Sequence, residues 1–358
     1  MEIHSDDNFL KVILKHLNHT KIDIDNPEEL EDTINEFMLN KLKPIAELLL
    51  KNIKQNVKRD IKRMREDQKG FEKRLIKRWR EPLLHLEGFI QQCLSEGNDF
   101  NKKFREKAAK ENDYLFEVLT LLHGRGCQIA NEILVLLRSG YSGGAYARWR
   151  TLHETVVIAM FIKDHGQALA EKYLHYEIVE NYKEALEYQK NCYKLGYEPL
   201  SDKEIDIIKK RKNEIALKYG NDFFKNYGWT ADILPKKERN FKSIEGKVNM
   251  GHMYSWYKLA CNNVHSGPKS ILFTSSLPKT AQGTVILAGP TNYGLADPGQ
   301  NCAISLNQVT ITLLLSKLNY DRILVSKALL LYIDEICTSF VRIQKQLEKD
   351  EMTLKNEN

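Results

Sequence analysis

The sequence has few cysteines and lacks the pairs that a metal or redox motif requires. Its six cysteines lie far apart, and no two are separated by only two residues. This spacing argues against a zinc ribbon or a disulfide framework and suits the reducing cytoplasm. Long apolar runs are also missing: the longest, Val156 to Ile162, has seven residues, whereas a membrane-spanning helix needs about 20. With no basic leader and apolar stretch at the start, we expect a cytoplasmic protein with no membrane partner.

Strand-like alternation is rare, and proline is scarce outside one segment. Four of the nine prolines and five of the 19 glycines fall in residues 267–299. There the runs Ile271–Thr274 and Thr284–Leu287 predict a small β-hairpin or an ordered loop. Elsewhere apolar residues recur at helical spacing. We therefore predict an all-α fold, a helical bundle with a long N-terminal helical arm and this Gly/Pro-rich loop.

The helical pattern divides the chain into three parts. Residues 1–95 are predicted to form a basic helical arm, residues 96–349 the core bundle and residues 350–358 a polar tail. The polar stretch Ser95–Asp99 is expected to break the helix between the arm and the bundle. A capping box at Ser201–Glu204 predicts the start of a helix within the bundle.

Positive charge is concentrated in the arm. Between Lys51 and Arg80 there are thirteen Lys or Arg and four Asp or Glu, an excess of nine, while the whole chain has a net charge of +6. The rest of the chain is therefore slightly acidic. An apolar stripe from Ile53 to Trp79 recurs at steps of three and four residues. We expect this stripe to pack on an acidic helix of the same subunit or of a second copy, and hence a homo-oligomer, such as a dimer.

A basic helix can also bind phosphates, so RNA or another nucleic acid is a predicted partner. The eight candidate nucleic-acid-binding residues are Lys58, Arg59, Lys62, Arg63, Lys73, Arg74, Lys77 and Arg78. The alternative is a solvated helix face, because few aromatic residues beyond Phe71 and Trp79 are available for base stacking.

A second unusual region is a glycine-containing turn followed by an apolar helix. Residues 140–144, GYSGG, match the GxSxG motif of α/β-hydrolases, but that motif needs a preceding strand. Here the preceding residues have a helical pattern, so we interpret the glycines as a tight turn between two helices. Four ionisable residues follow directly after this turn: Arg148, Arg150, His153 and Glu154. Clusters of ionisable residues beside apolar runs are enriched at functional sites.

The pair Arg148-x4-His153 matches the loose Arg-x4-6-His pattern of HEPN ribonucleases, which are helical bundles that cleave RNA without metal. Residues five apart on a helix differ in direction by about 140°. The pair can therefore share a face only if the helix is distorted or a second subunit completes the site. Arg150 and Glu154, four residues apart, can instead form an internal ion pair within a structural polar layer.

Asn263 and His265 end a later apolar helix, and we predict that they face the first cluster across the bundle. The candidate catalytic residues are then Arg148, Arg150, His153, Glu154, Asn263 and His265. Two histidines and a carboxylate can also bind a metal ion, but no HExxH motif or carboxylate pair supports this. We predict no metal and no other cofactor.

These motifs carry a family resemblance. Residues 140–155, Ala170-x-x-Tyr173, Tyr227-Gly228-Trp229 and Tyr257-x3-Cys261-Asn262-x-Val264-His265 resemble a bacterial family known as domain of unknown function, family 5677. The resemblance covers about residues 112–318. It implies a helical domain without an assigned reaction, with Arg150, Glu154 and His265 as recurring polar positions. A looser similarity links the chain to HEPN-type helical proteins.

Two functional hypotheses follow. In the first, the protein is a HEPN-like, metal-independent ribonuclease effector in bacterial antiviral defence or stress response. In it Arg150 and Glu154 orient the site, His153 or His265 transfers protons, and Arg148 contacts phosphate. In the second, the protein is a non-enzymatic interaction or sensor protein. Its polar layer is structural, and its basic arm binds a partner or nucleic acid.

Overall fold

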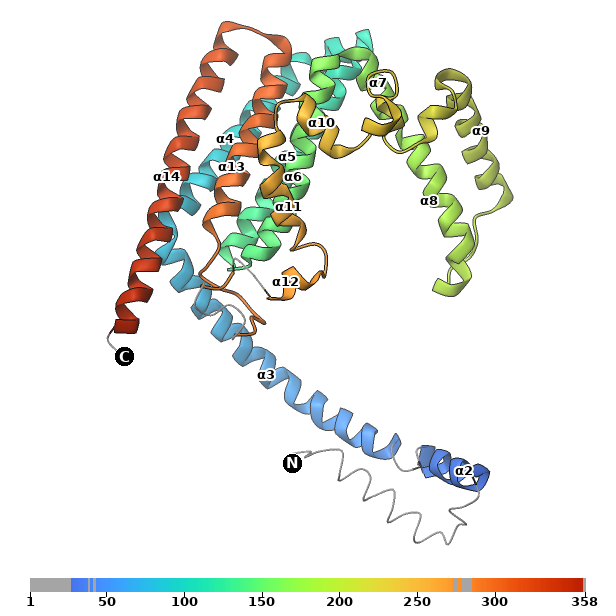
Figure 1. Ribbon diagram of the computed structural model, residues 1–358, viewed down its shortest axis with the longest axis vertical. Coiled ribbons are helices and arrows are strands. Elements are labelled where there is room, and N and C mark those ends of the chain that lie inside the picture. Colours follow the sequence, from blue (N-terminus) through green and yellow to red (C-terminus); the bar gives the residue numbers. More distant parts are fainter. Residues whose placement is uncertain (1–26, 38, 41–42, 273–275, 279–284, 357–358) are drawn as a thin grey trace. The chain divides into compact units, whose positions relative to one another are not determined.

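The computed structural model describes residues 27–356 except 38, 41–42, 273–275 and 279–284, and within these residues every regular element is a helix (Figure 1). The predicted all-α class is confirmed. Of the two structures predicted for the Gly/Pro-rich segment, a hairpin or an ordered loop, the described residues form no strand: Ile271 and Leu272 end α12 (Pro268–Leu272), and 285–287 have no regular structure. Pro268 suits the first helical position, where its missing N–H costs no hydrogen bond. Thr274 and Thr284 lie outside the described residues.

The chain forms two compact units, Met1–Phe71 and Glu72–Asn358. The first unit contains the acidic helix α2 (Pro27–Phe37) and most of α3 (Lys43–Arg78), which continues through Gly70 without a break. From residue 43 to residue 67 of α3, every side chain whose placement is described is exposed.

The long helical stretch of the sequence breaks at Trp79, which separates α3 from α4 (Arg80–Glu111). Pro82 explains why the helix breaks at Trp79, because proline has no N–H to donate to the carbonyl of Arg78 and its ring crowds the preceding turn. The hydrogen bonds from the Trp79 N–H to the Leu75 carbonyl and from the Leu83 N–H to the Trp79 carbonyl are kept, at 2.9 and 3.1 Å. The Trp79 side chain is fully buried and lies 6.1 Å from Phe340, ring centre to ring centre.

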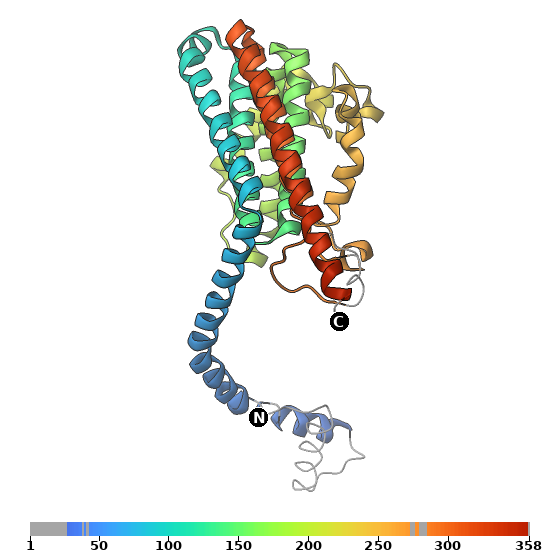
Figure 2. The ribbon, with the colours of Figure 1, turned by 90° about the vertical axis from the view of Figure 1, so that its left-hand side faces the viewer.

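Within the second unit, α4, α5 (Tyr114–Arg138), α6 (Ser142–His165), α13 (Ala296–Leu314) and α14 (Tyr320–Asn356) lie side by side as a bundle (Figures 1 and 2). α6 contacts α5, α13, α10 and α11, and α13 contacts α4, α5, α6 and α14. α6 and α13 are the central helices of the bundle, and a helix in this position has neighbours on several sides. The polar side chains of α6 can therefore contact different helices, depending on the side of α6 from which they project.

The helix break predicted at Ser95–Asp99 is wrong, because α4 runs through these residues. Gly97 does not form a turn; it lies within α4 and leaves room for a side chain of a neighbouring helix. A Cβ atom at this position would lie 2.2 Å from Cε1 of His123, whose buried ring packs against the glycine. His123 also hydrogen bonds with Thr310 of α13, with 3.1 Å between Nε2 and Oγ1. The glycine thus allows three helices to meet closely.

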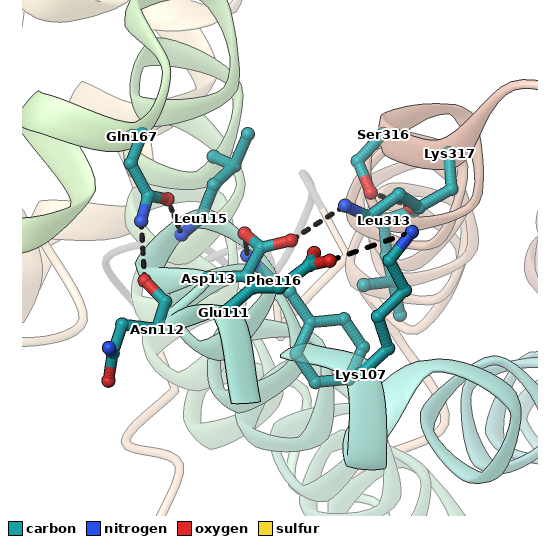
Figure 3. Close-up of polar contacts among 10 residues, drawn as sticks. All are labelled: Lys107, Glu111, Asn112, Asp113, Leu115, Phe116, Gln167, Leu313, Ser316 and Lys317. Atoms are coloured by element: carbon teal, nitrogen blue, oxygen red, sulfur yellow. Dashed lines mark hydrogen bonds and ion pairs between the residues drawn. The ribbon is translucent and has the colours of Figure 1, made fainter. Parts of the chain in front are cut away.

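The break between α4 and α5 lies further along the chain, at Asn112 and Asp113 (Figure 3). Asn112 has a φ of 53°, a left-handed conformation that asparagine tolerates better than most residues. The Asp113 carboxylate accepts a hydrogen bond from the Phe116 N–H at 2.9 Å and pairs with Lys317 at 2.6 Å. Gln167 links the Asn112 carbonyl to the Leu115 N–H. This corner ties α5 to the segments around Gln167 and Lys317.

The segment after α6 consists of shorter helices. They are α7 (Gln167–His175), α8 (Glu177–Asn191), η2 (Cys192–Leu195), α9 (Asp202–Tyr219), η3 (Asn221–Phe224), η4 (Gly228–Thr230) and η5 (Lys236–Glu238). The predicted capping box is confirmed at the start of α9: Ser201 caps the Glu204 N–H, and the Glu204 side chain accepts from the Ser201 N–H.

The chain then returns to the bundle through α10 (Phe241–Lys247), η6 (Gly251–Met253) and α11 (Tyr254–Cys261). After the Gly/Pro-rich loop, η8 (Leu315–Lys317) joins α13 to α14. α14 extends to Asn356, through most of the residues predicted to form a polar tail.

Candidate functional site

The predicted turn lies between two helices, as the helical pattern indicated. Gly140 has a φ of 80°, and Ser142 begins α6 with its side chain fully buried. The Ser142 hydroxyl hydrogen bonds with that of Ser276 at 2.7 Å. A nucleophile elbow follows a strand and exposes its serine. The helix before this turn and the enclosed hydroxyl therefore argue against hydrolase chemistry at Ser142.

Arg150 and Glu154 form a polar cluster with Tyr257 of α11 on one side of α6. The Arg150 guanidinium lies 3.1 Å from Oε1 of Glu154 and donates a hydrogen bond to the Tyr257 hydroxyl at 3.0 Å. The same hydroxyl donates to Glu154 at 2.6 Å, and the guanidinium carbon lies 5.1 Å from the centre of the Tyr257 ring. The Arg150 and Glu154 side chains are 24% and 33% exposed, so one edge of the cluster faces solvent.

The electrostatics of this cluster keep Arg150 charged and Tyr257 neutral. Partial burial alone would lower the pKa of Arg150, but the hydrogen bond to Tyr257 and the charge of Glu154 outweigh it and raise the pKa. The pKa of the Tyr257 hydroxyl is raised by burial and by its hydrogen bond to Glu154. Tyr257 is thus a neutral donor to a carboxylate that Arg150 balances.

His153 belongs to a separate and completely buried pair. Its Nε2 lies 2.7 Å from Oε1 of Glu245 on α10, and neither side chain is exposed to solvent. Trp149, Phe241 and Tyr257 surround the imidazole ring at 5.4 to 6.0 Å between ring centres. Nδ1 of His153 and Oε2 of Glu245 have no hydrogen-bond partner within the described part of the chain. A buried water commonly satisfies such atoms.

Arg148 points in another direction, toward α5. Its Nε lies 2.5 Å from the carboxylate of Glu132, and both side chains are about one third exposed. Arg148 and His153 therefore contact different helices, as an angle of about 140° between residues five apart requires. α6 is a regular helix here. Within one chain the Arg-x4-His pair does not form a joint site.

Asn263 and His265 lie just beyond the end of α11, and both are exposed. Asn263 Oδ1 lies close to Gly143 in the first turn of α6, where a Cβ atom would be 3.1 Å away. Tyr257 contacts α6 at Arg150, seven residues further on, or about 10 Å along the helix. The structure thus places Asn263 by the start of α6 and not beside Arg150 and Glu154.

The predicted cluster is therefore divided into an Arg150–Glu154 pair, a buried His153, an Arg148 that faces α5, and an exposed Asn263 and His265. No group of three or more potential metal ligands occurs among the described residues. Sequence reasoning missed Tyr257, Glu245 and Glu132 as the partners. Of these, Tyr257 carried a signal, because it belongs to the Tyr257-x3-Cys261 motif of the family resemblance.

The predicted nucleic-acid-binding residues lie on α3, and all eight are exposed. Arg59 is 3.6 Å from its neighbour Asp60, with both side chains more than 60% exposed. Arg78 pairs with Asp350 of α14 at 2.6 Å. Within the described part of the chain the other six form no ion pair with an acidic side chain.

Comparison with known proteins confirms the predicted family resemblance for part of the chain. Residues 116–277 match the model of a family described as a family of unknown function (DUF5677). The match runs from α5 to just beyond α12 and contains all six candidate catalytic residues, and it leaves out α3, α13 and α14. No curated protein and no solved structure matches the chain significantly. No helix among the described residues has the length and apolar character to cross a bilayer.

Proposed function

We propose that the protein is a non-enzymatic nucleic-acid-binding protein, in which the basic face of α3 contacts phosphates and the polar groups of α6 stabilise the bundle. In this proposal it acts in the bacterial cytoplasm, in a defence or stress setting. The observation that carries the proposal is the exposed, unneutralised positive charge along one side of α3.

The geometry of α3 separates its charged and apolar faces. At about 100° per residue, Lys58, Lys62, Lys69 and Lys73 fall within about 60° of one another around the helix axis. The apolar stripe of Val57, Met64 and Phe71 falls on the opposite side. Such a helix can bind a phosphate backbone with its lysines while the apolar stripe remains free for protein contacts.

The polar groups of α6 are suited to a structural role. A general base must reach the proton that it removes, and His153 is fully buried against Glu245. A cation that stabilises phosphate charge must also be available, and Arg148 is paired with Glu132. Of the two candidate histidines only His265 is exposed, so proton transfer by a candidate histidine would have to use His265.

The test is RNA binding by the full chain, measured by fluorescence anisotropy with a labelled single strand over a range of salt concentrations. Replacing Lys58, Lys62, Lys69 and Lys73 with glutamine should weaken binding and reduce the slope of log K against log salt. Each lost phosphate contact contributes about 0.7 to that slope for single strands, so a reduction of about 2 to 3 is expected.

The matched control replaces four exposed lysines elsewhere, Lys194, Lys203, Lys209 and Lys210. If both fourfold variants bind RNA equally well, α3 is not the binding surface. The same samples test the ribonuclease hypothesis. Cleavage of the labelled strand by the wild type, lost in His265→Ala, would show that the protein is an enzyme and contradict the proposal.

A further inference from the structure

The first turns of α14 expose large apolar side chains on the side that faces away from the bundle. Tyr320 is 78%, Leu324 58% and Leu331 56% exposed. Leu318, Ile323 and Leu330 are also among the exposed apolar residues. In Figure 2, α14 lies toward the viewer beside α4. Single exposed leucines are common, whereas a continuous group of this size marks an interaction surface.

The pattern around the helix shows that this surface differs from ordinary amphipathic packing. Leu329, Ile333 and Ile336 of the same helix are buried in the bundle. At about 100° per residue, Tyr320, Leu324 and Leu331 lie within about 40° of one another and nearly opposite Leu329. α14 is thus apolar on both sides over these turns, which is the pattern of a helix that is buried on both sides.

Charged residues define the extent of this surface and its symmetry. Lys327 lies within it, and Asp334 follows two turns later on the same side of the helix. Both are exposed, and neither forms an ion pair with another described residue. Their midpoint falls between Leu330 and Leu331. Beyond Asp334 the outer face becomes polar, with Glu335, Thr338 and Arg342.

We propose that the outer face of α14 from Tyr320 to Val341 forms the interface of a symmetric homodimer, in which α14 pairs antiparallel with α14 of a second copy and Tyr320 lies near the exposed Val341 of that copy. A two-fold axis near Leu330 and Leu331 places the leucines of both copies at the centre. The same axis brings Lys327 of each copy beside Asp334 of the other, so that the two opposite charges meet twice. A parallel pairing would instead place Lys327 against Lys327. Two-fold interfaces are self-complementary in this way.

Sedimentation equilibrium of the full chain tests the proposal. The wild type should dimerise, and Leu331→Glu should weaken the dimer at least about tenfold, which corresponds to about 1.4 kcal/mol. The matched control is Leu217→Glu on α9, whose leucine is 91% exposed and lies outside this surface. That variant should dimerise like the wild type. Circular dichroism confirms that both variants are folded.

Charge exchange provides the sharper test, since it depends on the symmetry. Lys327→Asp and Asp334→Lys should each weaken the dimer, because each places like charges together. The double variant should recover dimerisation to within about threefold of the wild type, because opposite charges meet again. A monomeric wild type, a Leu331→Glu dimer as stable as the wild type, or a double variant as weak as the single variants would each overturn the proposal.

Discussion

Arg150 and His153 are three residues apart on α6, yet their surroundings differ in a way that decides what each can do. Arg150 keeps one edge in solvent and is balanced by Glu154 and Tyr257. His153 has no exposed atom and is enclosed by aromatic rings and Glu245. Burying a paired charge contributes little net stability, but leaving one partner alone is costly. His153 and Glu245 therefore stabilise the bundle only as a pair.

This difference predicts the effect of Glu245→Ala. We expect a loss of about 3–5 kcal/mol of unfolding free energy, the cost of breaking a fully buried pair. Glu245→Gln should cost much less, because its amide can still hydrogen bond with the His153 imidazole. Urea denaturation followed by circular dichroism measures both. Glu154→Ala is the comparison, since its carboxylate is one third exposed; a loss as large as that of Glu245→Ala would contradict the role of burial.

At the scale of helices, local signals were predictable where the chemistry is local. The capping box at Ser201 and the break caused by Pro82 depend only on residues that are close together in the sequence. Both helix boundaries can therefore be predicted from the sequence alone. The polar stretch at Ser95–Asp99 had the composition of a turn, but α4 continues because Gly97 accommodates the ring of His123. That contact joins residues 26 positions apart, and no pattern in the sequence indicates it.

In the candidate site, too, contacts within one helix could be predicted, whereas contacts between helices could not. The Arg150–Glu154 ion pair could be predicted, since residues four apart meet on one face of any helix. The separation of Arg148 from His153 also followed from helix geometry. Glu132, Glu245 and Tyr257 come from three other helices, so their roles depend on how the bundle packs. Packing directions are not encoded in the spacing of residues along one helix.

The corner between α4 and α5 gives a pH-dependent prediction. Burial raises the pKa of Asp113, but the hydrogen bonds from Lys317 and Phe116 outweigh it, and the net pKa lies below its ordinary value. A lowered carboxylate pKa stabilises the fold above the unfolded pKa of about 4, and this contribution is lost as pH falls through the lower folded value.

Asp113→Asn keeps an acceptor for the N-cap but removes the charge. We expect the wild type to be more stable than this variant at pH 7, and the difference to shrink toward zero below about pH 4. Urea titrations at several pH values measure it. Glu111→Gln, which removes an exposed carboxylate 3.8 Å from Lys107, is the control and should change stability little. A wild-type advantage that grows on acidification would contradict the assignment.

At the scale of the whole molecule, the compact unit Glu72–Asn358 begins within α3, well before the end of the predicted arm at residue 95. The difference matters for stability, because residues 72–95 carry large buried side chains. Trp79, Leu86 and Phe89 are all fully buried. Truncating a buried Phe or Trp to alanine alone costs about 3–5 kcal/mol. Losing all three side chains therefore approaches or exceeds the 5–15 kcal/mol that holds a typical domain folded.

Two truncations test this division. Removing residues 1–71 leaves every buried side chain of α4 in place, so we expect a folded protein with a single cooperative thermal transition. Removing residues 1–95 takes away Trp79, Leu86 and Phe89 and uncovers their partners, among them Phe340. That protein should lack the transition and aggregate. Circular dichroism melting and sedimentation distinguish the two. A shorter protein that folds as stably as the longer one would show that residues 72–95 are dispensable for the bundle, because the core can then close without them.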